Sequence, residues 1–316
     1  MKKGLDKNRV KGMLFGAFLG DALGAPHEFA CNRDVIYTGK LEHQAFYDSR
    51  FQGRKILQVG QITDDSEMTI TLFRAIIRDN GYNRDSVIQD YMKWANSGLW
   101  MMGTNTRKLL KGIKTLKGYQ KRIDKILELP ISERSQSNGC LMRCCPLALI
   151  WNNECVVQDV SITNPHPVNI DCCLVYISSI RLALLGKSNV EIFDKVKLLA
   201  RTSEVREVLN QVENKKARDI RDKKGWCLHG LWCALMGLMY FESYSKLVEW
   251  IITSQPGSDT DTNACIAGAL FGAYTGYENL DLEQSSNISI LINCDTENGP
   301  TPRQPEYTVR DVLALI

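Results

Sequence analysis

Glycine recurs at every fourth position in two similar nonapeptides, one near each end of the 316-residue chain. Residues 12–20 read GMLFGAFLG and residues 268–276 read GALFGAYTG, so six of nine positions are identical. Inside a helix, glycine is less stable than alanine by about 0.5–1 kcal/mol per residue, and its repetition on one helix face indicates that another backbone lies very close. The repeated pattern therefore predicts tightly packed helices drawn from the two ends of the chain.

The remaining apolar pattern is mainly helical. Apolar residues recur at helical spacing, as in Met68, Leu72 and Ile76, and again within residues 175–184. Only residues 288–292 (ISILI) alternate as a strand does. The sequence has neither a βαβ rhythm nor a G-x-G-x-x-G motif, which argues against a dinucleotide-binding sheet. We therefore expect an all-α fold, a single globular domain of many helices.

A change of composition after Gly276 suggests the main division of the chain. The residues that follow are polar and include Pro300, Pro302 and Pro305, before a short apolar stretch at 309–316. We expect the globular domain to occupy residues 1–280 and residues 281–316 to form a C-terminal appendage outside the core.

Composition and charge narrow the class of protein. Hydrophobic residues make up 44% of the chain and charged residues 24%, the balance of a globular protein that buries a large core. With 39 Lys and Arg against 36 Asp and Glu, the net charge of +3 does not by itself imply a polyanionic partner. Two stretches, residues 107–125 and 214–224, are locally basic. We interpret them as solvated faces, with binding of a polyanion as the alternative.

The eleven cysteines point to a reducing compartment. Their number is odd, Cys144 and Cys145 are adjacent, and no C-x-x-C pair occurs, so neither a disulfide framework nor a structural zinc site is expected. The apolar residues 13–19 imitate a secretory signal, but Asp21 interrupts the pattern. No run approaches the roughly 18 apolar residues of a membrane span. We expect an intracellular protein, cytoplasmic or nuclear, without a membrane partner.

Two acidic clusters each precede an apolar run of helical character: residues 63–67 (TDDSE) and 259–263 (DTDTN). Either cluster alone is explained as a helix N-cap, where negative charge is favoured by about 0.3–1 kcal/mol. Together they supply four aspartate carboxylates and the hydroxyls of Thr63 and Thr262, more than capping needs. If they converge, repulsion between the carboxylates demands cations. All-oxygen ligands select Mg²⁺, Mn²⁺ or Ca²⁺, and two metal ions would suit this ligand count.

Two polar loops are further candidates. Residues 135–139 (SQSNG) run into an apolar stretch, and such a loop can offer backbone amides to an anion while Gly139 permits close backbone approach. A plain helix cap explains the same loop equally well. Residues 163–167 (TNPHP) form a stiff turn around His166, and a lone histidine of this kind is more often structural.

Four motifs, taken in order, resemble the signature of the ADP-ribosylglycohydrolases. They are GDALGAPHE at residues 20–28, TDDSEM at 63–68, NGCLMR at 138–143 and DTDTNA at 259–264. The resemblance extends over roughly residues 10–277. Four motifs in the right order are a far more specific match than any one of them.

The resemblance implies an all-α catalytic domain with two Mg²⁺ or Mn²⁺ ions, which cleaves the bond between ribose C1″ of ADP-ribose and a modified side chain. Carried over residue by residue, the catalytic roles fall on Glu28, Asp64 and Asp65, and the family glutamate at Glu28 binds metal or gates the site. The implied metal ligands are Thr63, Asp64, Asp65, Asp259, Asp261 and Thr262. The implied contacts to the diphosphate and distal ribose are Ser135, Ser137, Asn138, Gly139, Met142 and His166.

This chain departs from the family pattern at three positions. Asn164 stands where the family usually has a histidine, and His166 follows two residues later. Ser258 replaces the second glycine of a Gly-Gly-Asp. Met102 replaces an acidic residue of arginine-directed members, which disfavours arginine as the acceptor without excluding it. If Asn164 occupies the place of the histidine, Asn164→His is expected to tighten ADP-ribose binding, and His166→Ala to do little.

Other functions stay open. An inactive ADP-ribose-binding or structural member of the same fold is the main alternative, although such a protein has no reason to keep mutually repelling carboxylates. A thiol nucleophile made from Cys144 or Cys145 with His166 lacks a supporting motif. We expect a monomer whose partners are an ADP-ribosylated protein substrate, with the acceptor arginine or serine unresolved, and the product ADP-ribose. A nucleic-acid substrate is the less favoured alternative.

Overall fold

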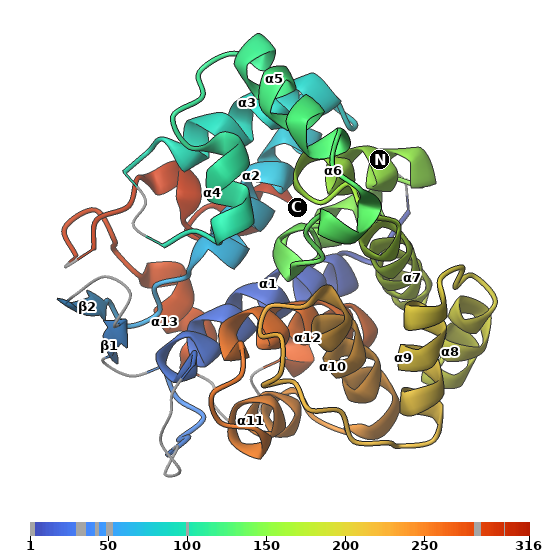
Figure 1. The fold of residues 1–316 in the computed structure, drawn as a ribbon. Helices are drawn as coiled ribbons and strands as arrows, with labels where there is room; N and C mark the ends of the chain where they lie inside the picture. The colour runs from blue at the N-terminus through green and yellow to red at the C-terminus, as the bar shows by residue number, and fades with distance from the viewer. Residues whose placement is uncertain are drawn as a thin grey trace.

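The computed structural model describes residues 4–29, 36–41, 44–48, 53–98, 101–280, 286–299 and 301–316. Within these ranges the protein is built mainly of α-helices around one continuous hydrophobic core (Figure 1). The expected all-α class is confirmed.

The elements follow one another along the chain in this order. The α-helices are α1 (Lys7–Gly24), α2 (Asp64–Arg78), α3 (Arg84–Ala95), α4 (Thr104–Leu110), α5 (Leu116–Leu127), α6 (Asn153–Thr163), α7 (Pro167–Leu184), α8 (Asn189–Lys197), α9 (Ser203–Glu213), α10 (Cys227–Tyr240), α11 (Tyr244–Ser254), α12 (Thr260–Thr275) and α13 (Asn287–Asn293). Short 3₁₀ helices are η1 (Ala25–His27), η3 (Ile131–Glu133), η4 (Asn138–Cys140), η5 (Cys145–Leu149), η6 (Tyr277–Asn279), η7 (Pro305–Tyr307) and η8 (Val312–Leu315). The strands β1 (Gln44–Asp48) and β2 (Gly53–Leu57) form an antiparallel hairpin, with Gln44 opposite Leu57.

Helices α1 and α12 form the centre of the molecule and lie side by side (Figure 1). A β-carbon placed on Gly16 would lie 2.2 Å from the carbonyl oxygen of Gly268, and one placed on Gly268 would lie 2.2 Å from that of Gly16. Likewise, a β-carbon placed on Gly12 would lie 2.1 Å from the carbonyl oxygen of Gly272. Because only hydrogen fits between these backbones, the expected close packing of the two ends of the chain is confirmed.

Helix α7 is a long apolar helix of the core. Its length and composition would also suit a membrane span, but 72% of it is buried inside the fold, as expected for the core helix of a globular protein. Pro167 stands in its first turn, where no backbone donor is needed, and the side chain of His166 accepts from the N–H of Val168. Sequence and packing therefore agree on where this helix begins.

The strand expected at residues 288–292 is wrong, because these residues belong to α13. On a helix, Ile288, Leu291 and Ile292 share one face, and that face packs on the core with Leu291 fully buried. Asn287 anchors the helix start by donating to the carbonyl of Gly39 at 2.8 Å. A short apolar run has the same pattern in a buried strand and in a buried helix, so its secondary structure depends on tertiary packing.

The described part of the segment after residue 280 contributes side chains to the core. Tyr307, Val309 and Val312 are buried in the main core. The guanidinium of Arg303 pairs with the buried carboxylate of Glu67 in α2, with an Nε to Oε1 distance of 2.6 Å. The expectation of a peripheral appendage is therefore wrong for this segment, while a domain boundary at residue 280 stays a prediction.

Replacement of Gly16 by alanine tests the contact between α1 and α12. The added methyl group would overlap the Gly268 carbonyl, and overpacking of this kind costs about 1–3 kcal/mol or more. We expect Gly16→Ala to lower the free energy of unfolding by at least that amount in urea denaturation. Gly103→Ala is the matched control, because a β-carbon at Gly103 meets open space. Equal stability of the two variants would contradict the packing described here.

Candidate active site

The predicted site residues gather around one cavity of about 400 Å³. It lies where the N-terminal ends of α2 and α12 meet the end of α1 and the loop that leads into η4. The predicted residues that line it are Glu28, Asp64, Asp65, Ser135, Ser137, Asn138, Gly139, Met142, Asp259, Asp261 and Thr262. Thr63 lies directly behind this lining, and His166 lies apart from it.

The carboxylates of the two acidic clusters converge. Oxygen atoms of Asp21, Asp65 and Asp261 lie within 4.8 Å of one another, and the same holds for Glu28, Asp259 and Asp261. Asp261 belongs to both groups. Segments about 200 residues apart in the sequence thus form one continuous acidic centre.

Neither cluster serves only as a helix cap. Thr63 is the N-cap of α2 and Asp259 that of α12, yet neither side chain accepts a capping hydrogen bond from its own helix. Thr63 instead donates its hydroxyl to Asp21, and Asp259 accepts from the amide of Asn138 at 2.8 Å. The capping interpretation, the simplest one for either cluster alone, does not describe their side chains.

Burial makes the charged state of these carboxyl groups costly. It raises the pKa of Asp65 and of Asp261 well above the ordinary value, and the neighbouring acidic groups raise both further. Burial also raises the pKa of Asp64 to about 7, although the backbone N–H of Gly103 donates to it at 3.2 Å. A divalent cation bound among these carboxylates would offset both the cost of burying their charge and the repulsion between them.

The donor set fits a hard metal ion. Oxygen Oδ1 of Asp65 is buried and has no hydrogen-bond partner within the described part of the chain, which leaves it free to bind a cation. The surrounding donors are carboxylate and threonine oxygens, the ligands that Mg²⁺ and Mn²⁺ prefer. Three of the predicted ligands, Asp65, Asp259 and Asp261, belong to the acidic groups that could hold a metal ion, and Thr63, Asp64 and Thr262 stay predicted ligands.

Asp21 is a residue of the site that the sequence pattern did not assign a role. Its oxygen Oδ1 accepts from the hydroxyl of Thr63 at 2.7 Å. Oxygen Oδ2 accepts from the backbone N–H groups of Thr63 at 3.0 Å and Ser66 at 3.1 Å. Asp21 therefore caps α2 from α1 and orients Thr63, and its carboxylate also belongs to the group of acidic residues that could hold a metal ion.

The loop of residues 135–139 is held in place from beneath by Asn164. The amide of Asn164 donates to the carbonyl of Ser137 at 3.2 Å, to its hydroxyl at 3.0 Å and to the carbonyl of Ser135 at 3.3 Å. Asn169 donates to the carbonyl of Ser137 at 2.8 Å. Asn164 is fully buried, so it shapes the loop and does not line the cavity.

His166 also lies outside the lining. Its Nδ1 caps α7, and its Nε2 lies 3.2 Å from the side-chain nitrogen of Gln136. Burial lowers the pKa of this imidazole. Its predicted contact with a diphosphate stays a prediction, and the geometry gives it a structural place at the start of α7.

The alternative thiol nucleophiles are poorly placed. Cys144 and Cys145 are both fully buried in the core. Burial raises the pKa of Cys145 well above its ordinary value, which keeps this thiol protonated and weakly nucleophilic. The arrangement therefore favours the acidic cavity as the reactive centre.

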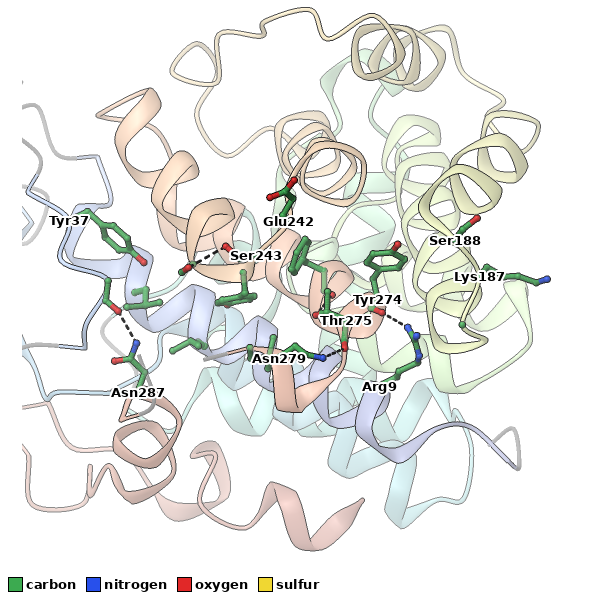
Figure 2. Close-up of a pocket in the computed structure, with 18 of the residues that line it drawn as sticks. Arg9, Tyr37, Lys187, Ser188, Glu242, Ser243, Tyr274, Thr275, Asn279 and Asn287 are labelled. Carbon is green, nitrogen blue, oxygen red and sulfur yellow. Dashed lines mark hydrogen bonds between the residues drawn. The ribbon is translucent and has the colours of Figure 1, made fainter. Parts of the chain in front are cut away.

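A second and larger cavity, of about 570 Å³, contains none of the predicted site residues (Figure 2). Its floor is apolar and includes Leu19, Leu23 and Phe271. Figure 2 shows Arg9 and Asn279 among its polar lining, where Arg9 donates to the carbonyl oxygen of Tyr274. Size alone would have selected this cavity, whereas the chemistry selects the acidic one.

Comparison with known proteins agrees with the site. The ADP-ribosylglycohydrolase family model matches residues 3–288, and the chain belongs to this family. The ADP-ribosyl-[dinitrogen reductase] glycohydrolase of Rhodospirillum rubrum is 25% identical over 301 residues, covering 90% of this chain and 92% of that protein. The ADP-ribosylarginine hydrolase Tri1 of Pseudomonas putida is 24% identical over 298 residues, covering 89% of this chain and 74% of that protein.

A solved structure shares the fold. A chain of an ADP-ribosylglycohydrolase-related protein complex superposes with a TM-score of 0.68 at 20% identity, covering 90% of this chain and 97% of that chain. At this identity the likeness concerns the arrangement of the helices.

The position of Asn164 reverses the expectation formed from sequence alone. An imidazole cannot reproduce the donation of one amide group to both Ser135 and Ser137. We therefore expect Asn164→His and Asn164→Ala to weaken ADP-ribose binding about tenfold, which corresponds to about 1.4 kcal/mol, measured by calorimetry. Asn279→Ala, in the second cavity, is the control and should bind normally. Tighter binding by Asn164→His would restore the original expectation.

Because the buried charges repel one another, we expect Asp261→Asn to stabilise the protein when metal is absent and to remove the stabilisation that added metal gives. In chelator, loss of one repelling carboxylate should raise the free energy of unfolding by on the order of 1 kcal/mol. Stabilisation by added Mg²⁺ or Mn²⁺ should be lost in the same variant, measured by thermal unfolding. Asp194→Asn, at an exposed position in α8, should change neither quantity. A variant that keeps full stabilisation by metal would remove Asp261 from the ligand set.

Proposed function

We propose that this protein is a metal-dependent hydrolase that removes ADP-ribose from modified proteins by cleaving the glycosidic bond at ribose C1″. The observation that supports this proposal is the convergence of both acidic clusters and the 135–139 loop on one cavity. Family membership supports the hydrolysis of ADP-ribose linkages in general. Our proposal adds to this general activity the dependence on metal, the identity of the bond that is cleaved and the kind of acceptor.

Two Mg²⁺ or Mn²⁺ ions, when bound, would act as Lewis acids toward ribose hydroxyls and lower the pKa of a bound water. The protein contributes the cavity around them. Asp65 and Asp261 lie together at its acidic end, and Asp21 beside them fixes Thr63 by accepting from its hydroxyl. The ligands are thus oriented before substrate arrives.

The rest of the lining binds and orients the substrate. Asn138 connects the two halves of the site, because its side chain donates to Asp259 and its backbone N–H donates to the carbonyl of Gly225 at 2.7 Å. Gly139 also lines the cavity, and the lack of a side chain there would let a diphosphate approach its backbone closely. A substrate held by its diphosphate at this loop would extend its terminal ribose toward the carboxylates.

Glu28 is the candidate for proton transfer and gating. It follows η1 at the rim of the cavity and lies within reach of Asp259 and Asp261. A glycosidic transition state carries positive charge on the ribose, which nearby carboxylates stabilise. A carboxyl group at this rim can give a proton to the leaving group or hold a water molecule.

The acceptor is proposed to be a protein side chain, arginine or serine. Met102, in the cavity lining, supplies no negative charge to hold a guanidinium group. The Pseudomonas putida relative is nevertheless named for ADP-ribosylarginine, which keeps arginine among the candidates. We propose a monomeric, intracellular enzyme, in keeping with its free cysteines.

A binding-only protein is the competing function, and one assay separates the two. ADP-ribose release is measured from arginine-linked and serine-linked peptides with Mg²⁺, with Mn²⁺ and with EDTA. We expect release with metal, its loss in EDTA, and a strong loss in Asp65→Asn. Binding of ADP-ribose without release under every condition would favour the inactive alternative.

Glu28→Gln should affect turnover more than binding. We expect kcat to fall about 10²- to 10⁴-fold, because a general acid or gate acts in the transition state. Calorimetry should find the affinity for ADP-ribose within about threefold, since the diphosphate loop is untouched. Glu242→Gln, in the second cavity, is the control. Normal turnover with poor binding would assign Glu28 to substrate binding instead.

A further inference from the structure

The loop of residues 135–139 forms backbone hydrogen bonds with the segment that leads into α10. The backbone N–H of Asn138 donates to the carbonyl of Gly225 at 2.7 Å. In the opposite direction, the N–H of Cys227 donates to the carbonyl of Gln136 at 3.1 Å. Between these two bonds the two backbones form an antiparallel bridge. The shape of the loop therefore depends on where the start of α10 lies.

Trp226 lies at the centre of this pairing. Its backbone is opposite that of Ser137 in the bridge. Its indole N–H donates to the side-chain oxygen Oε1 of Gln136 at 2.9 Å, so a bond between side chains adds to the backbone bonds. Because an indole N–H can only donate, this bond also determines which end of the Gln136 amide faces Trp226.

The other end of the Gln136 amide meets a competing interaction. Its nitrogen Nε2 lies 3.2 Å from Nε2 of His166. A neutral imidazole has one N–H group, and Nδ1 of His166 accepts from the N–H of Val168 at 3.1 Å. His166 can therefore accept from Gln136 only in the tautomer that gives up this cap of α7. The bond from Trp226 orients the Gln136 side chain without such a conflict.

The ring of Trp226 is held by three side chains on its own side of the pairing. The guanidinium of Arg218 lies 5.0 Å from a ring centroid, and the ammonium group of Lys223 lies 4.9 Å from it. The imidazole of His229 meets the ring edge to face, with the centroids 5.4 Å apart. Cations are attracted to the face of an aromatic ring. The indole therefore cannot turn away from Gln136 without losing these contacts.

Arg218 and His229 are fixed in turn by hydrogen bonds in which every donor meets an acceptor. Burial lowers the pKa of His229 to about 4, so its imidazole is neutral near pH 7. Its Nδ1 accepts from Nε of Arg218 at 2.9 Å, and its Nε2–H donates to the carbonyl of Asp222 at 2.6 Å. The carbonyl of Arg218 accepts from Gln255, at the end of α11, at 2.7 Å. This support connects Trp226 to α10 and α11.

Trp226 acts on the cavity from outside it. Neither Trp226 nor Gln136 lines the acidic cavity, whereas Ser135, Ser137 and Asn138 do. Any effect of the indole on a ligand in this cavity therefore passes through the loop. A loop whose groups are already oriented binds a ligand more tightly, because ordering them during binding costs affinity.

We propose that Trp226 is a positioning residue: its indole N–H, through Gln136, holds the 135–139 loop in the conformation that binds the diphosphate of ADP-ribose. This inference rests on the proposed function, which assigns the diphosphate to that loop. The expected effect is on binding rather than on bond cleavage, because the carboxylates of the cavity, Glu28 included, do not bond to the indole.

The test compares two tryptophan variants. Trp226→Phe keeps an aromatic face for Arg218 and Lys223 but removes the indole N–H. The matched control is Trp232→Phe, inside α10, where the indole nitrogen is buried and has no hydrogen-bond partner within the described part of the chain. Calorimetry measures ADP-ribose affinity, steady-state rates on an ADP-ribosylated peptide give KM and kcat, and thermal unfolding measures stabilisation by Mn²⁺.

We expect Trp226→Phe to weaken ADP-ribose binding and to raise KM by about three- to tenfold, the scale of one hydrogen bond, with kcat within about twofold. Trp232→Phe should bind ADP-ribose as the parent protein does. Stabilisation by Mn²⁺ should be unchanged in both variants, because neither tryptophan lines the acidic cavity.

The possible failures are distinguishable. A parent protein that binds no ADP-ribose would contradict the proposed function. If the parent binds it, then equal affinity in Trp226→Phe would overturn the positioning role alone. So would an equal loss in Trp232→Phe, or a fall in kcat at unchanged KM.

Gln136→Leu tests the route from the indole to the loop. Leucine fills similar space but has no oxygen to accept the indole N–H, so this variant should also weaken ADP-ribose binding. The double variant with Trp226→Phe should bind no more weakly than Gln136→Leu alone, because both changes remove the same bond. Losses that multiply would show that the indole does not act through Gln136. Should Trp226→Phe fail to fold, unchanged affinity in Gln136→Leu would overturn the proposal.

Discussion

The contact between the backbones of α1 and α12 sets the positions of Asp21, Glu28 and Asp261 relative to one another. At the end of this contact, a β-carbon on Gly24 would lie 2.6 Å from the Cα of Asp261. The turn that follows α1 therefore brings Glu28 beside the start of α12, while Asp21 reaches the start of α2. A pair of helices with larger side chains between them would separate these groups. The site thus depends on the absence of side chains at the glycines along this helix contact.

The same closeness carries an energetic cost. Burial and mutual repulsion raise the pKa of Asp65 and of Asp261, so the empty cluster opposes folding. Burial also raises the pKa of Glu67, one turn into α2, but Arg303 and the indole N–H of Trp94, which donates to Glu67 at 2.8 Å, offset part of this cost. The protein therefore separates its buried acids into those with fixed counter-charges and those left for a ligand to neutralise.

The sequence predicted those parts of the molecule in which local pattern and tertiary contact agree. The glycine repeat predicted the helix pair, and the ordered acidic motifs predicted the cavity, because each cluster adjoins one of these helices. Residues 288–292 were misjudged, because a short apolar run does not specify its period without its neighbours. Asn164 was expected near a phosphate. Its burial beneath the loop depends on Ser135 and Ser137 folding over it, which no spacing along the chain records.

The ion pair between Arg303 and Glu67 joins residues 236 positions apart. During synthesis the chain emerges from its N-terminal side, so α2 is available long before its counter-charge. Until residue 303 has left the ribosome, Glu67 has no guanidinium group to offset its burial beside Asp21 and Asp64. The ion pair therefore forms only after residue 303 has been made, when every motif of the cavity has already left the ribosome.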